Sequence, residues 1–127
     1  MTDALSLRAL LRLDALVGLG CGLALSVAAG PLGALFGLPP TLLLVAGLAL
    51  FPCAALMLLA ARGTPGSRVL VTLVVVGNWA WAAASLALLA LTSPSPLGIA
   101  FVLAQAAVVA GFAWLERRAA VRPLRTA

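Results

Sequence analysis

The sequence contains no histidine, no tyrosine and no lysine, and only 3 of its 127 residues are acidic. Without histidine, the commonest metal ligand and the usual axial ligand of haem are missing, and no Ser-His-Asp triad can form. Glycine-rich phosphate loops, H-E-x-x-H motifs and ligand-spaced cysteine clusters are also missing. We therefore expect no metal, no cofactor and no catalytic residues.

Cysteine is scarce as well. Cys21 and Cys53 both fall within apolar segments, and neither belongs to a C-x-x-C pair. This placement predicts small buried side chains, and it argues against a disulfide or a thiol redox centre.

Charge is the other scarce property, at 9% of residues against 65% hydrophobic residues. A soluble domain carries about a quarter charged residues. A chain of this length cannot bury so much apolar surface in a core of its own, so lipid is the expected solvent. The net charge of +5 is accordingly assigned to the membrane surface and not to nucleic-acid binding.

Four apolar stretches are each long enough to cross a bilayer, which takes roughly 20 residues. They cover residues 10–29, 41–61, 68–91 and 97–115, and a basic tail follows at 116–127. Strands are not expected, because the stretches are continuously apolar and do not alternate. Short connections make consecutive helices antiparallel neighbours. The prediction is a single all-α domain over 1–127, an up-down-up-down four-helix transmembrane bundle.

Two boundaries leave alternatives open, and a third is expected at Pro123. The first helix begins either near residue 10 or earlier, with Thr2 or Asp3 as its cap. The same segment resembles a secretory signal, but we interpret it as a membrane-spanning helix because it is retained. The apolar segment Pro31–Pro39 is broken by glycine and proline, which favours a short helical turn in the outer interface over a re-entrant loop. The basic tail is expected to continue the fourth helix until Pro123.

All eight basic residues are arginines, and all flank the same side of the four-segment pattern, whereas the connections at 30–41 and 92–98 carry no charge. Under the positive-inside rule this bias predicts a bacterial inner-membrane protein with both termini in the cytoplasm. Trp114 lies at the same edge, where an aromatic anchor is common. The residues expected to meet lipid headgroups are Trp114, Arg8, Arg12, Arg62, Arg68, Arg117, Arg118, Arg122 and Arg125.

Asp14 is the only carboxylate within the first three segments, roughly one turn below the cytoplasmic edge. It shares a face with Gly18 and Gly22, a G-x-x-x-G pair suited to close helix packing. We expect a structural salt bridge or hydrogen bond, with an arginine such as Arg68 in reach. The alternative is a carboxylate that binds a proton or a cation.

Asn78 and Gln105 are expected near the midplane, within reach of each other, with Ser85 on the same face as Asn78. The favoured interpretation is that they hydrogen-bond between helices, and the alternative is that they line a substrate path.

Four other features have default structural interpretations. Trp79 and Trp81 lie in the middle of a helix, where core packing is expected. Glu116 adjoins two arginines and is expected to be a solvated ion-pair partner. A small-residue face on the fourth helix offers close packing within the bundle or against a partner; it comprises Ala104, Ala107 and Gly111.

One set of residues supports a resemblance: Asn78–Trp79–Ala80–Trp81 followed by Ser85, the run Gly98–Gln105, and Glu116. With these the chain resembles small uncharacterised four-helix inner-membrane proteins of bacteria. The resemblance covers most of the chain and implies the helix count, but it implies no activity, substrate or cofactor. Small multidrug transporters and fluoride channels fit less well, since the first group needs a deeper acidic residue with tyrosines and the second needs polar tracks that this sequence lacks.

Three hypotheses for function follow. The preferred one is a non-enzymatic accessory or structural subunit of a larger membrane assembly, whose partners are lipid and other membrane proteins or further copies. The second is a homo-oligomeric transporter or channel lined by Asp14, Asn78, Ser85 and Gln105, because four helices are too few to enclose a roomy path alone. The third is a membrane enzyme acting on a lipid or quinone through Asp14 and Glu116.

Overall fold

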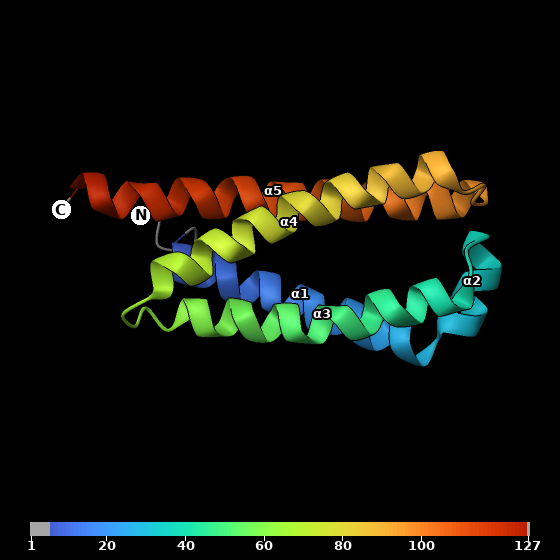
Figure 1. Cartoon of the computed structure of the whole chain (residues 1–127), viewed down its shortest axis with the longest axis horizontal. Coiled ribbons are helices and arrows are strands. Elements are labelled where there is room, and N and C mark those ends of the chain that lie inside the picture. The colour runs from blue at the N-terminus through green and yellow to red at the C-terminus, as the bar shows by residue number, and fades with distance from the viewer. Residues whose placement is uncertain (1–5, 127) are drawn as a thin grey trace.

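The computed structural model describes the chain over residues 6–126, with side chains described over residues 6–120. Within this range every regular element is a helix, and four helices are long and apolar enough to cross a membrane. The fifth is a short helix between the first two long ones (Figure 1). The helices are α1 (Leu7–Val27), α2 (Ala29–Phe36), α3 (Pro40–Ala61), α4 (Ser67–Leu91) and α5 (Pro96–Thr126).

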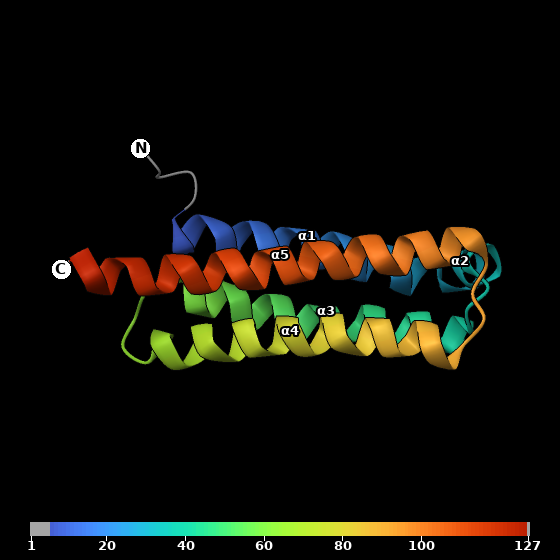
Figure 2. The ribbon, with the colours of Figure 1, turned by 90° about the horizontal axis from the view of Figure 1, so that it is seen from above.

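The long helices form two closely packed pairs, α1 with α3 and α4 with α5. Figure 2 shows the second pair lying alongside the first, with α5 next to α1 and α4 next to α3. Contact between the pairs is sparser than contact within them. We call one end of the bundle the α2 end, because α2 and the α4–α5 connection lie there. The opposite end, with the start of α1 and the α3–α4 connection, is the arginine end (Figure 1).

The helix boundaries differ modestly from the sequence prediction. Helix α1 begins at Leu7, three residues before the predicted start, because the Ser6 side chain caps it by accepting a hydrogen bond from the Ala9 N–H at 3.2 Å. The proposed caps Thr2 and Asp3 lie outside the described residues. Helix α5 does continue past residue 115, and its backbone stays helical to Thr126, beyond the predicted end at Pro123.

The pair α1 and α3 approaches most closely at two glycines. A Cβ on Gly22 would lie 2.9 Å from the Gly47 carbonyl oxygen, and a Cβ on Gly47 would lie 2.8 Å from Leu25 Cβ. Helices in lipid gain little from the hydrophobic effect, so this backbone-to-backbone packing is the main source of attraction between them.

At the α2 end, a connection between distant segments holds the two pairs together. Helix α2 stops at Gly37, whose φ of 68° suits glycine. The Ser95 N–H donates to the Phe36 carbonyl at 2.9 Å, the Ser95 hydroxyl donates to the Leu35 carbonyl at 2.8 Å, and the Phe36 and Phe101 rings stack at 4.5 Å. The segment 31–39 is thus a short helix at the end of the bundle, as predicted, and not a loop between the long helices (Figure 1).

Candidate functional site

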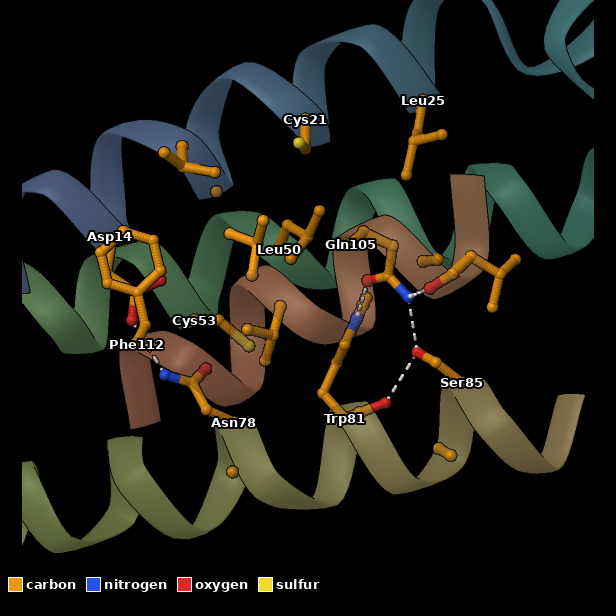
Figure 3. Close-up of a pocket in the computed structure, with 18 of the residues that line it drawn as sticks. Asp14, Cys21, Leu25, Leu50, Cys53, Asn78, Trp81, Ser85, Gln105 and Phe112 are labelled. Carbon is orange, nitrogen blue, oxygen red and sulfur yellow. Dashed lines mark hydrogen bonds between the residues drawn. The ribbon is translucent and has the colours of Figure 1, made fainter. Parts of the chain in front are cut away.

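A cavity of about 530 Å³ lies between the two helix pairs, and all four long helices contribute to its wall. Its volume falls within the range of small-molecule sites, roughly 300–1,000 Å³. Most of the wall is apolar, with Leu25, Leu43 and Phe101 among its residues. The polar residues that line it are Asp14, Asn78, Trp81, Ser85 and Gln105 (Figure 3).

Three side chains from three helices meet toward the arginine end of the cavity, and we call them the carboxyl–amide cluster: Asp14, Asn78 and Glu116. The Asn78 side-chain amide donates to Asp14 Oδ2 at 2.8 Å and to Glu116 Oε1 at 3.1 Å. The three side chains are 5%, 7% and 0% exposed. Figure 3 shows Asp14 and Asn78 pointing toward each other from α1 and α4.

The sequence prediction for Glu116 was wrong. The side chain is fully buried and bonds to Asn78 instead of standing in solvent beside the arginines. Because α5 continues as one helix, position 116 falls on the buried face that already includes Val102, Ala106 and Ala113. The same helix turns Arg117 and Arg118 outward.

The structural hydrogen bond expected for Asp14 is present, but its partner is not an arginine. Its hydrogen bond comes from Asn78, and among the described side chains no arginine bonds to either carboxyl group. Arg68 stays exposed, and Arg8 lies beside Gly63 of the α3–α4 connection. The arginines were expected to reach Asp14 from the membrane edge, but burial of the cluster within the bundle keeps it out of their reach.

The cluster leaves one acceptor unused. Glu116 Oε2 is buried and has no hydrogen-bond partner. Burying an ionised carboxylate without a counter-charge is costly, and most costly in hydrocarbon. Asp14 and Glu116 share one neutral donor, the Asn78 amide, and this donor supplies no positive charge to balance two ionised carboxylates.

A second polar group lies nearer the α2 end and involves only α4 and α5. Trp81 Nε1 donates to Gln105 Oε1 at 3.0 Å, and Gln105 Nε2 donates to Ser85 Oγ at 2.8 Å. The Ser85 hydroxyl in turn donates to the Trp81 carbonyl at 2.8 Å (Figure 3). Asn78 and Gln105 thus both bond between helices, as expected, but not to each other, because the Asn78 amide is bonded to the two carboxyl groups.

The remaining predicted residues divide by location. Gly18 and Gly22 face α3. On α5, Ala104 and Ala107 are exposed and a Cβ on Gly111 would meet no atom within 4 Å, so this face is open within the described part of the chain, and Ala104 also lines the cavity. The exposed Trp114 carries the Arg118 guanidinium 4.7 Å above its ring.

Three packing expectations need adjustment. Trp79 is 45% exposed instead of packed in a core. Cys21 is exposed and Cys53 only half-buried, although both were expected to be buried; both are free thiols that line the cavity. The side chains of Arg122 and Arg125 lie outside the described part of the chain.

Three further features were not anticipated: the burial of Glu116, the cavity, and the contact between Phe36 and Ser95. The burial of Glu116 could have been predicted, because position 116 continues the helical spacing of Val102, Ala106 and Ala113. The other two depend on how distant segments pack.

Comparison with known proteins yields no match, whether to a protein-family model, to a curated protein or to a solved structure.

Proposed function

We propose that this chain is a multi-pass membrane protein that binds a small lipophilic molecule inside its bundle and carries it through the membrane, with no catalytic step. The observation that supports this function is the apolar cavity of about 530 Å³ between the two helix pairs. In lipid, a mostly apolar cavity with a few polar groups selects molecules that combine an apolar body with a polar head.

The proposal differs from the transporter hypothesis drawn from sequence in one respect. That hypothesis required a dimer or a larger ring, whereas the four long helices of a single chain already line this partly open cavity. The polar residues expected to line a path, Asp14, Asn78, Ser85 and Gln105, are all in its wall. A monomer is therefore the proposed working unit.

A cavity-filling substitution tests this function. Gly77 lines the cavity, and a Cβ there would meet no atom within 4 Å. Gly77→Phe should therefore fill the space without disturbing the fold. We expect it to weaken binding of the neutral fluorescent probe N-phenyl-1-naphthylamine by about tenfold or more. Binding is measured in phosphatidylcholine nanodiscs as saturable energy transfer from tryptophan, with empty nanodiscs subtracted.

The matched control is Gly20→Phe. Gly20 is also helical and exposed with open space around it, but it does not line the cavity. This variant should bind the probe like the unsubstituted chain. Equal binding by the Gly77→Phe chain and the unsubstituted chain would contradict the proposed function.

We further propose that the arginine end faces the cytoplasm of a bacterial cell, with both termini there, as the resemblance to small bacterial inner-membrane proteins also implies. Support comes from Arg8, Arg62, Arg68 and Arg117, which belong to the helix ends and the connection at this end.

Cysteine labelling tests this orientation. In a chain carrying Cys21→Ala and Cys53→Ala, we add either Thr64→Cys in the α3–α4 connection or Ser93→Cys in the α4–α5 connection; both sites are exposed. A membrane-impermeant maleimide added to spheroplasts should label Cys at position 93 and spare position 64 until the cells are lysed. The reverse pattern would overturn the orientation.

A second candidate function, an accessory subunit of a larger assembly, is favoured by the open α5 face of Ala104, Ala107 and Gly111. Small residues permit close approach of another helix. If this face docks a partner, Ala107→Leu should remove a stoichiometric partner that co-purifies with the unsubstituted chain in mild detergent. Binding of the neutral probe should not change.

A further inference from the structure

We propose that the molecule bound in the cavity is a lipophilic cation, and that its binding releases a proton from the carboxyl–amide cluster. This inference rests on the proposed function and adds to it the chemical class of the ligand and the coupled ion. It follows from three observations: the pair of carboxyl groups, the buried oxygen without a partner, and the apolar wall beside them.

All four long helices contribute titratable or polar groups around the cluster. Helix α1 contributes Asp14 and α5 contributes Glu116, while α4 contributes the neutral amide of Asn78. Helix α3 contributes the Cys53 thiol, which also lines the cavity. None of these groups is basic, and the described arginines do not bond to either carboxyl group.

Two ionised carboxylates cannot share such a site without a counter-charge. They would repel each other, and neither would be solvated by water. With the cavity empty, the cluster therefore holds at least one proton. Asn78 orients one oxygen of each carboxyl group, and Glu116 Oε2, which has no other hydrogen-bond partner, can carry a proton.

A cation in the cavity supplies the missing charge. The O–H bond of one carboxylic acid breaks, its proton passes to water at the arginine end, and the carboxylate pairs with the bound cation. Charge balances, since one positive charge enters as one leaves. Asp14 and Asn78 line the cavity and so present the cluster to its contents.

The wall selects the body of the cation. Its apolar side chains favour a hydrophobic ion over a hydrated one, because a hydrated ion would lose its water shell there. Trp81 also lines the cavity. Its N–H is bonded to Gln105, and an indole ring attracts a cation above its face.

The test compares two ions of nearly equal size and opposite charge, tetraphenylphosphonium and tetraphenylborate, against the full chain in phosphatidylcholine nanodiscs. Saturable binding is measured by calorimetry with empty nanodiscs subtracted. Repeating the titration in two buffers of different ionisation enthalpy counts the protons released. We expect the cation to bind about tenfold or more tightly than the anion, with close to one proton released per cation.

Two neutral variants locate the effect. Asp14→Asn and Glu116→Gln keep an oxygen that can accept the Asn78 hydrogen bond while removing the charge. Each should weaken binding of tetraphenylphosphonium by about tenfold or more and abolish proton release. Size-exclusion elution and tryptophan emission like those of the unsubstituted chain show that both variants fold. Gly20→Phe again serves as the control with unchanged values.

The outcomes separate the two proposals. If the neutral probe binds in the cavity but the two ions bind equally, or no proton is released, the cation proposal fails and the proposed function stands. It also fails if both neutral variants keep cation binding and proton release. If filling the cavity with Gly77→Phe changes no binding at all, the proposed function itself fails.

Discussion

Alanine in place of Gly98 is expected to lower the free energy of unfolding by about 3 kcal/mol. Gly98 lies in the first turn of α5, and a Cβ there would overlap the carbonyl oxygen of Phe36 and lie 2.8 Å from its carbonyl carbon. The obstacle is backbone, so no side chain can rotate away. The clash also falls where Ser95 bonds to Leu35 and Phe36, so the connection between α2 and α5 should open.

The measurement is chemical or thermal unfolding of the purified chain in mild detergent, followed by tryptophan fluorescence. Gly111→Ala is the matched control, because it makes the same change in the same helix at a position where a Cβ meets no atom within 4 Å. This control should be neutral or stabilising by up to about 1 kcal/mol, since alanine is the better helix former. Equal destabilisation by both variants would refute the role assigned to the close contact at Phe36.

The spanning helices could be predicted from sequence because lipid makes apolar length almost sufficient as a criterion. The run predicted at 41–61 corresponds to α3 at Pro40–Ala61, and that at 68–91 corresponds to α4 at Ser67–Leu91. The first helix was placed three residues late, because Ser6 caps it. Cap choice depends on one hydrogen bond, which composition does not determine.

The site was predicted only in part. Asp14 and Asn78 were identified because polar groups are rare within hydrocarbon, and that reasoning needs only their position in an apolar run. Glu116 was misassigned because its neighbours in sequence are Arg117 and Arg118, whereas the face it occupies on α5 is what decides its surroundings. The cavity had no counterpart in the sequence, because it arises from the spacing between two helix pairs and not from any local pattern.

The second large effect is expected from Asn78→Leu, which should lower the free energy of unfolding by about 2 kcal/mol or more. Leucine is similar in size but donates no hydrogen bond, so Asp14 Oδ2 and Glu116 Oε1 would both lose their partner in a buried site. Such unmet acceptors are costly because no water replaces the amide. The same unfolding measurement applies.

Ser85→Ala is the comparison for this variant, since Ser85 belongs to the same helix and the polar group it joins lies within one helix pair. Its expected cost is below about 1 kcal/mol, the usual scale of a single side-chain bond between membrane helices. If Ser85→Ala lowered the free energy of unfolding as much as Asn78→Leu, the special role assigned to Asn78 between the helix pairs would be contradicted. The contrast matters because Asn78 joins α4 and α5 to α1, across the sparse boundary between the pairs.

Asn78 connects the pairs near the arginine end, and Ser95 with Phe36 connects them at the α2 end. Combining Asn78→Leu with Gly98→Ala should therefore release both connections, and because the two positions are far apart along the bundle their costs should add.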